Sequence, residues 1–295
     1  MSTPDACTHR LERGEIFVAP CPDGLLPESE DLSFLMQQRL NSTIHKNISY
    51  NPQTDIVSGF VQHSPDQAKR LQDLLRHFSE RACAWLAEWL PDYSRAWQPD
   101  RASLRTEEEA TRKLRLTARN DLLHFDAFPS RPARGHRILR LYVNINPTDD
   151  RVWVTSDTFA KVLDTYGARV GLPTPRSVPW VRRLELAKWG ERLLSQLFQS
   201  NAPERTEYDE FMLRLHHYLK NNDEFQEAAS RKIWHFKPGT AWLLFSDGVS
   251  HAELRGQYAM EHSYFVAPEA LALPDEAPFA LLERMSAART LPHAA

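Results

Sequence analysis

Strand-like alternation of apolar and polar residues is confined to two blocks of this chain, residues 101–155 and 231–266. Helical patterns fill the segments before, between and after these blocks. The clearest strand has two faces of different character, with Leu139, Leu141 and Val143 on one and Arg140, Tyr142 and Asn144 on the other. Two strand sets separated by a helical insertion predict an antiparallel barrel, and therefore an α+β fold with flanking and inserted helices.

Other β-containing classes fit less well. No Gly-rich phosphate loop follows any strand, which disfavours a doubly wound α/β sheet. With only 10 Gly and a helical N-terminal third, the chain also disfavours an immunoglobulin-like sandwich. In the second block, two strands flank the turn pair Asp247-Gly248.

We expect a single domain over residues 1–295. Its parts are a largely helical N-terminal flank (1–100, beginning with an extended arm over 1–30), barrel strands (101–155 and 231–266), a helical insertion (156–230) and a C-terminal helical tail (267–295). The clearest helix starts at Ser64-Pro65 and ends before Pro91, because its apolar residues follow helical spacing. Within the insertion, helices are predicted around 159–166, 180–198 and 211–218.

Composition is ordinary for a soluble globular protein. Hydrophobic residues make up 42% and charged residues 25% of the sequence. No apolar stretch approaches the 18 residues that a transmembrane helix needs. The first residues carry no apolar signal region, which favours a cytoplasmic location.

The triplet His124-Phe125-Asp126 predicts a metal site. In a short strand over residues 122–126, His124 and Asp126 point to the same face. Two histidines and one carboxylate on one face of a metal leave three coordination positions open, which is the ligand set of non-haem Fe(II) oxygenases. The alternative is chance, because about one His-x-Asp triplet is expected at random in such a chain.

The second histidine of the triad must come from another strand. His235, His251 and His262 lie in the second strand block, whereas His216 and His217 fall in a helical pattern. We favour His251, because it follows a turn, beside a strongly apolar strand, with small residues on either side. A hydrogen-bonded structural histidine remains the alternative, and His251-Ala252-Glu253 is itself a second His-x-carboxylate triplet.

Many oxygenases of this type use 2-oxoglutarate, whose distal carboxylate requires a cation. Arginine suits this role because its planar guanidinium meets a carboxylate with two hydrogen bonds. An arginine about ten residues after the distal histidine is absent here, and we expect Arg140 to be the anchor, with Arg137 as the second choice. Tyr142 and Asn144 share the face of Arg140 and complete the predicted cofactor-binding set. Either arginine is equally suited to an anionic substrate.

Positive charge is concentrated around the predicted metal site. Between residues 101 and 140, ten Arg and Lys residues outnumber five Asp and Glu residues, although the whole chain has a net charge of −3. This basic zone indicates an anionic substrate or co-substrate, and a solvated basic surface is the alternative. Its candidate substrate contacts are Arg112, Lys113, Arg115, Arg119, Arg131 and Arg134.

Several sequence blocks resemble the bacterial Kdo hydroxylases. These are Leu-His-Phe-Asp-Ala-Phe-Pro-Ser-Arg-Pro (123–132), Arg-Ile-Leu-Arg (137–140), Asn-Ile-Asn-Pro (144–147), Phe-Lys-Pro-Gly-Thr-Ala-Trp (236–242) and Ser-Asp-Gly-Val-Ser-His-Ala-Glu-Leu-Arg-Gly-Gln (246–257). The likeness covers most of residues 100–266, and the Asp-Ala-Phe-Pro-Ser-Arg-Pro block is much more specific than His-x-Asp.

The resemblance implies a double-stranded β-helix, of the jelly-roll or cupin-like type, that depends on Fe(II), 2-oxoglutarate and O2. Such enzymes hydroxylate C3 of the sugar Kdo in the lipid A inner core to give Ko, with succinate and CO2 as co-products. The family's iron ligands map onto His124, Asp126 and His251.

The expected partner is therefore a Kdo-containing lipid A, an anionic glycolipid, and no nucleic acid is expected. The segment Val178–Trp189 mixes Trp with basic residues and predicts peripheral contact with the cytoplasmic face of the inner membrane. Two rival functions remain open at this point. One is a 2-oxoglutarate oxygenase that acts on a protein side chain or small metabolite, and the other is a non-catalytic barrel that binds anionic sugars or nucleic acid.

Overall fold

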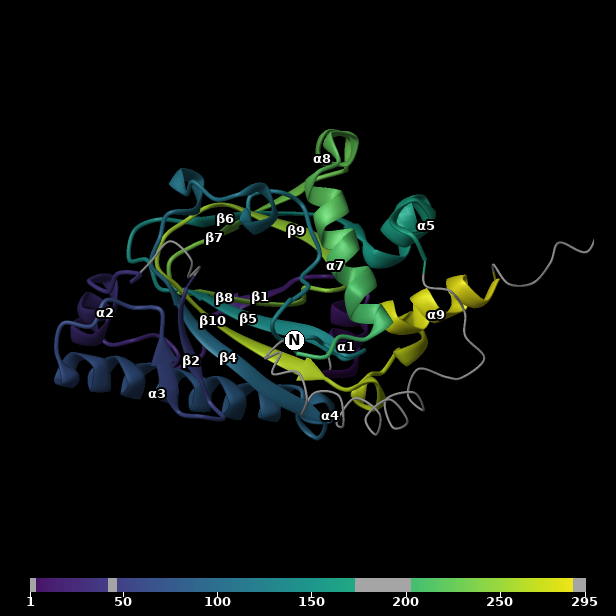
Figure 1. The fold of residues 1–295 in the computed structure, drawn as a ribbon. Helices are drawn as coiled ribbons and strands as arrows, with labels where there is room; N and C mark the ends of the chain where they lie inside the picture. Colours follow the sequence, from purple (N-terminus) through teal and green to yellow (C-terminus); the bar gives the residue numbers. More distant parts are fainter. Residues whose placement is uncertain (1–3, 42–46, 173–202, 289–295) are drawn as a thin grey trace, which may run out of the picture.

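Two antiparallel β-sheets face each other in the computed structural model, which describes residues 4–41, 47–172 and 203–288 (Figure 1). The large sheet has the strand order β1-β8-β5-β10-β4-β2-β3, and the small sheet has the order β7-β6-β9. The large sheet consists of β1 (Phe17–Pro20), β2 (Ile48–Asn51), β3 (Ile56–Ser58), β4 (Trp97–Arg105), β5 (Arg137–Asn144), β8 (Thr240–Phe245) and β10 (Ala259–Val266). The small sheet consists of β6 (Arg151–Thr158), β7 (Lys232–Phe236) and β9 (Val249–Arg255).

The chain passes repeatedly between the two sheets. It runs from β5 in the large sheet to β6 and β7 in the small sheet, returns to β8, crosses to β9 and ends in β10. The turn Asp247-Gly248 therefore joins strands of different sheets and does not close a hairpin, since β8 pairs with β1 and β5 while β9 pairs with β6. This alternation gives the expected α+β barrel of two strand sets, with a helical segment inserted between β6 and β7.

Helices cover one face and one end of the barrel (Figure 1). The N-terminal helices are α1 (Pro4–Glu12), α2 (Ser29–Met36), α3 (Pro65–Trp89) and α4 (Pro91–Ser94). The later helices are α5 (Phe159–Val170), α7 (Glu207–Lys220), α8 (Asp223–Ala228) and α9 (Pro278–Ala288). The helix expected around 180–198 lies outside the described residues. None of the described helices is long and apolar enough to cross a membrane.

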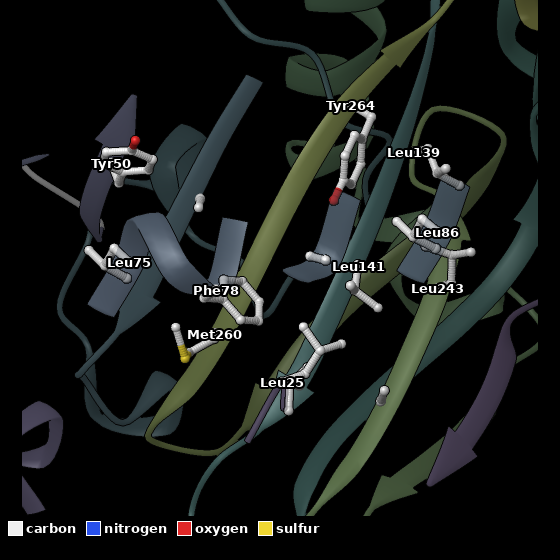
Figure 2. Packing of buried hydrophobic residues seen from close by; sticks show 14 of the residues in the cluster. Leu25, Tyr50, Leu75, Phe78, Leu86, Leu139, Leu141, Leu243, Met260 and Tyr264 are labelled. Atoms are coloured by element: carbon white, nitrogen blue, oxygen red, sulfur yellow. The ribbon is translucent and has the colours of Figure 1, made fainter. Parts of the chain in front are cut away.

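Helix α3 packs along the outer face of the large sheet and forms the largest core with it (Figure 2). Its start is the predicted one, because the Ser64 hydroxyl accepts a hydrogen bond from the Gln67 amide and Pro65 occupies the first turn. The buried stripe of α3 comprises Leu71, Leu75, Phe78, Ala82 and Leu86, and it meets sheet residues that include Leu139, Leu141, Leu243, Met260 and Tyr264. This contact leaves the opposite face of the sheet to line the barrel interior.

The N-terminal hundred residues differ from the prediction. They contribute three whole strands, β1, β2 and β3, and the first four residues of β4 to the large sheet. The expected extended arm over 1–30 contains α1, β1 and the first two residues of α2. The three whole strands have only three or four residues, which is too short for a recognisable alternation. Their pairing is also remote in sequence, since β1 pairs with β8 more than 200 residues later.

Candidate metal centre and its surroundings

The structure brings the three predicted metal ligands together. One ligand atom from each of His124, Asp126 and His251 lies within 4.8 Å of the others, and all three residues are buried. The backbones of His124 and His251 form an antiparallel bridge, with N–H to carbonyl distances of 3.1 and 2.9 Å. The amide of Asp126 donates to the Ser246 carbonyl at 3.0 Å. Backbone hydrogen bonds therefore fix all three ligands relative to β9 and to the end of β8.

Both imidazoles are prepared for metal binding. The Nδ1 atom of His124 lies 2.7 Å from the Leu122 carbonyl, and that of His251 lies 3.1 Å from the Val249 carbonyl. A carbonyl only accepts, so Nδ1 carries the proton in each ring and Nε2 is left with its lone pair. Burial lowers the pKa of both histidines, and for His124 the charge of Lys220 lowers it further. The rings are therefore neutral, as a metal ligand requires.

Arg140 occupies the second oxygen of the Asp126 carboxylate. The Oδ1 atom of Asp126 lies 3.6 Å from His124 Nε2, and the Oδ2 atom accepts a hydrogen bond of 2.6 Å from Arg140 Nη1. Burial acts to raise the pKa of Asp126, but the guanidinium of Arg140 holds it well below its usual range. The ionised carboxylate thus offers one oxygen to a metal.

Behind Asp126, a buried network alternates arginine and glutamate side chains. Glu261 Oε2 accepts from Arg140 Nη2 at 2.7 Å and from Arg105 Nε at 2.6 Å. Glu253 Oε2 accepts from Arg105 Nη1 at 2.8 Å and from Arg151 Nη2 at 2.6 Å. Each carboxylate is shared by two guanidinium groups, so the network holds three arginines side by side in the barrel without leaving their charges unpaired.

Aromatic rings line the interior beside this network. Trp153 stacks on His251 with ring centroids 5.5 Å apart, and Tyr142 stacks on Trp242 at 5.2 Å. Arg140 lies over the ring of Tyr142, 4.8 Å from its centroid. Among the residues that the structure describes, the buried Tyr142 hydroxyl, the indole nitrogens of Trp153 and Trp242, and the Nε atoms of Arg140 and Arg151 have no hydrogen-bond partner. Buried polar atoms without partners indicate a position for a polar ligand.

The other histidines of the second strand block face elsewhere. The Nε2 atom of His262 lies 2.7 Å from Ser79 Oγ of α3, so His262 points to the outer side of the large sheet. His235 is exposed on β7, 3.6 Å from Asp150. His216, which the sequence places in a helix, does belong to α7, but its ring lies 5.0 Å from that of His124. The choice of His251 over its neighbours therefore agrees with the geometry.

Two members of the predicted cofactor-binding set lie outside this cluster. Arg137 sits on the other face of β5, where it pairs with Asp247 at 2.8 Å and lies over the ring of Phe245. The reason is strand parity, since adjacent side chains alternate faces. Asn144 is on the interior face, but its amide donates to the carbonyls of Phe236 and Asp149, and its oxygen accepts from the Asn146 amide. Its polar atoms are thus used to hold a turn.

The basic zone is largely neutralised by ion pairs. Arg112 pairs with Glu109 at 3.4 Å, Arg119 with Asp121 at 2.6 Å, and Arg131 with Asp100. In the described parts of the chain, no ion pair is found for the exposed Lys113, Arg115 and Arg134. Of the six candidate substrate contacts, these three cations therefore stay available to bind an anionic substrate.

Sequence reasoning missed much of the arginine–glutamate network. Glu253 was considered only as part of a second His-x-carboxylate triplet, and neither Glu261 nor Arg105 was singled out. In β6 the sequence does carry a signal. Arg151 and Trp153 alternate with the apolar Val152 and Val154, which places Arg151 and Trp153 on the same face of the strand. Parity places two side chains on one face, but it does not reveal which partner strand they will meet. The network residues come from β4, β5, β6, β9 and β10.

Comparisons with known proteins agree with this geometry. The family model of the 3-deoxy-D-manno-oct-2-ulosonic acid (Kdo) hydroxylases matches residues 2–289. No curated protein sequence gives a significant match. Crystal structures of the Kdo hydroxylase KdoO, described as a non-heme Fe(II) alphaketoglutarate-dependent dioxygenase, are similar over 96% of this chain and 89% of theirs, at 30% identity.

Three of these structures differ in what they contain. The TM-score is 0.80 for the apo form, 0.79 for the complex with alphaketoglutarate and Fe(III), and 0.81 for the complex with cobalt(II). The match extends over the whole barrel and confirms the predicted jelly-roll fold. With nearly the entire sequence matched by the family model, the chain belongs to the Kdo hydroxylase family.

Proposed function

We propose that this chain is an Fe(II)- and 2-oxoglutarate-dependent dioxygenase that hydroxylates C3 of Kdo in the lipid A inner core. The overall reaction consumes 2-oxoglutarate, O2 and one C–H bond, and gives succinate, CO2 and the C3 alcohol, Ko. The observation that carries the proposal is the convergence of His124, Asp126 and His251 within 4.8 Å. Membership of the Kdo hydroxylase family supplies the substrate class.

The donor set fits ferrous iron. Two neutral imidazoles and one carboxylate oxygen would hold it through His124 Nε2, His251 Nε2 and Asp126 Oδ1. When bound, Fe(II) supplies the redox chemistry that couples O2 to oxidation of the keto acid and of the sugar. Arg140 holds the other oxygen of Asp126, so the carboxylate would offer the metal a single oxygen.

2-Oxoglutarate would bind beside the metal, against the arginine network. Arg140 is the proposed anchor, as the sequence predicted, through its Nε atom, which has no partner among the described residues. Arg105 and Arg151 hold Glu261 and Glu253 behind it. The Tyr142 hydroxyl and the Trp153 indole N–H are buried and without partners among the described residues, and both suit an anionic acceptor. The stacked aromatic rings exclude water from the same space. These side chains therefore combine donors for a dicarboxylate with apolar ring surfaces.

The proposed acceptor carries lipid A phosphates as well as the Kdo carboxylate. Lys113 and Arg115 lie in the segment between β4 and the metal ligands, which contacts β9 through hydrogen bonds from Gly256 and Glu253. We assign phosphate contacts to these two exposed cations. Lipid A is a membrane lipid, so the enzyme would meet it at an anionic surface, on the cytoplasmic side. The segment 178–189, expected to contact that membrane, lies outside the described residues.

One experiment tests the reaction. Purified protein with Fe(II), 2-oxoglutarate and Kdo-lipid A should yield a product heavier by one oxygen in mass spectrometry, with one succinate formed per product. Omitting 2-oxoglutarate, or replacing Asp126 by Ala, should abolish both signals. Succinate formation with a peptide or small metabolite, and none with Kdo-lipid A, would reject the assigned substrate. A chain that binds no ferrous ion would reject the enzyme assignment altogether.

A second experiment tests the phosphate contacts. The double variant Lys113→Ser/Arg115→Ser should raise the KM for Kdo-lipid A and weaken its salt dependence, because fewer phosphate charges are contacted. The KM for a short Kdo glycoside without phosphates should not change. Equal effects on both substrates would show that the two cations do not contact phosphate.

A further inference from the structure

Residues 122–126, which include the proposed ligands His124 and Asp126, lie at the outer edge of the small sheet. They contact β9 through one isolated bridge, in which the amide and the carbonyl of His124 both face His251. Because successive backbone groups point to opposite edges of an extended segment, the groups of Leu123 and Phe125 face away from β9. No described strand pairs with that outer edge.

A glutamine side chain occupies the place of the missing strand. Gln226 of α8 accepts from the Leu123 amide through Oε1 at 2.9 Å and donates to the Leu123 carbonyl through Nε2, also at 2.9 Å. A carboxamide carries one acceptor and a donor, as a peptide group does, and so it can reproduce both hydrogen bonds of a strand neighbour. The same Nε2 donates to the Leu219 carbonyl at 2.9 Å, which ties the contact to the end of α7.

His216 of α7 satisfies the next outward-facing group. Its Nδ1 atom lies 2.8 Å from the Phe125 carbonyl, and its Nε2 atom lies 3.4 Å from the carbonyl of Thr117. A carbonyl only accepts, so Nδ1 of His216 donates its proton to Phe125 in the shorter contact. The two side chains together cover the outer edge on both sides of His124.

We propose that Gln226, supported by His216, is a positioning residue for the metal ligands. The Gln226 carboxamide acts as a substitute strand that holds residues 123–125 against β9, and thereby sets the direction of the His124 and Asp126 side chains. This inference rests on the proposed function only for the identity of the metal. It gives the inserted helices α7 and α8 a role in the active site, although the hydrogen bonds of Gln226 go to the backbone of Leu123 and Leu219.

A purely structural role makes a different prediction. Gln226 is half-buried and joins α8 to the barrel, so its loss could act on folding alone. In that case a variant would unfold more easily, but the folded fraction would bind metal as tightly as before. A positioning role requires instead that metal affinity falls while the protein stays folded, because the ligands lose their fixed orientation.

The test uses Gln226→Ala, with Glu227→Ala as the matched control on the exposed side of the same helix. Titration with Co(II) should show an affinity about 10-fold weaker for Gln226→Ala and unchanged for Glu227→Ala. Hydrogen–deuterium exchange of the metal-free protein should be faster in the peptide that contains Leu123, and unchanged in peptides from α3. Unchanged Co(II) affinity and unchanged exchange would overturn the proposal.

A second variant covers the case in which Gln226→Ala does not fold. Gln226→Glu keeps the size and the acceptor for the Leu123 amide, but removes the donor to the Leu123 and Leu219 carbonyls. It should also weaken Co(II) binding and speed exchange at Leu123. If the wild-type protein itself bound no Co(II), the proposed function would fail, whereas faster exchange in both Gln226 variants would still establish the support of residues 123–125.

Discussion

Arg140 donates a 2.6 Å hydrogen bond to the Asp126 oxygen that is not directed at His124. The same guanidinium donates to Glu261 at 2.7 Å, so a single side chain connects the carboxylate of the metal site to the arginine–glutamate network. The planar guanidinium can meet two carboxylates in fixed directions. Arg140 therefore fixes the direction of a proposed metal ligand and places its own guanidinium next to the proposed co-substrate site.

Arg140→Lys should weaken metal binding as well as 2-oxoglutarate binding. Lysine keeps the charge, but its compact ammonium group cannot span Asp126 and Glu261 in the same geometry. We expect Co(II) affinity to fall by about 10- to 100-fold, as is typical when a partner of a metal ligand is lost. The measurement is a Co(II) titration, followed by a 2-oxoglutarate titration of the Co(II)-loaded protein.

Arg76→Lys is the control for this prediction. Arg76 also makes two hydrogen bonds to a carboxylate, that of Asp55, but at the surface. It should leave both affinities unchanged. Wild-type Co(II) affinity in Arg140→Lys would contradict the orienting role of the guanidinium.

Trp153→Phe should weaken 2-oxoglutarate binding but leave the stability of the free protein nearly unchanged. Phenylalanine keeps a ring against His251 but removes the buried indole N–H, which has no partner among the described residues. Without the co-substrate, removal of an unpaired donor offsets the lost packing, and the melting temperature should change little. With it, loss of a hydrogen bond to a carboxylate, about 1.5–3 kcal/mol, should weaken 2-oxoglutarate binding roughly 10- to 100-fold.

Trp234→Phe provides the contrast. The Trp234 indole donates to Thr155 at 2.9 Å, so its loss should lower stability and leave 2-oxoglutarate affinity unchanged. Calorimetric titration of both Co(II)-loaded variants with 2-oxoglutarate measures the two affinities. Equal 2-oxoglutarate affinities in the two variants would show that Trp153 does not contact the co-substrate.

Local patterns predicted the elements that contain enough residues to show a period. Helix α3, strand β5 and the His124–Asp126 pair were all recognised, because spacing along the chain decides which side chains share a face. The choice of His251 also agrees with the geometry, and it depended on a turn and an apolar neighbouring strand. Features that depend on spacing within one segment could therefore be predicted from the sequence.

Contacts between distant segments were not accessible in this way. The hydrogen bonds between Gln226 and Leu123 join residues 103 positions apart, and Arg105 meets Glu253 across 148 positions. No local pattern distinguishes such a residue from an exposed glutamine or arginine. The Asp247-Gly248 turn misleads for the same reason, since its residues fit a hairpin but the sheet assignment of β8 and β9 depends on other strands.

Arg137→Met should reduce stability without affecting the active site. Arg137 was the second choice as anchor, but it is buried with Asp247 on the other face of β5. Breaking a buried pair leaves the Asp247 carboxylate unpaired and should lower the free energy of unfolding by about 3–5 kcal/mol. The double variant Arg137→Met/Asp247→Leu should recover much of this loss. Denaturant unfolding measures both, and a changed 2-oxoglutarate affinity of folded Arg137→Met would contradict the assignment.

Protonation of His262 should account for part of the stability that the protein loses at acid pH. It is buried between β10 and α3, where it contacts Ser79 Oγ at 2.7 Å and stacks on Tyr264. Burial lowers its pKa from 6.5 to about 4. Between these two values the unfolded chain binds a proton that the folded protein does not bind, so stability falls as the pH falls through this range. The full contribution of His262 is about 3 kcal/mol.

The variant His262→Gln tests this contribution. Glutamine keeps hydrogen-bonding groups near Ser79 but does not titrate, so the free energy of unfolding should depend less on pH between about 4 and 6.5 than in the wild type. At pH 8 the variant should be the less stable protein, because it loses the ring that stacks on Tyr264. The difference between the two proteins should therefore shrink on acidification. Parallel unfolding curves over this pH range would show that His262 is not the group that responds.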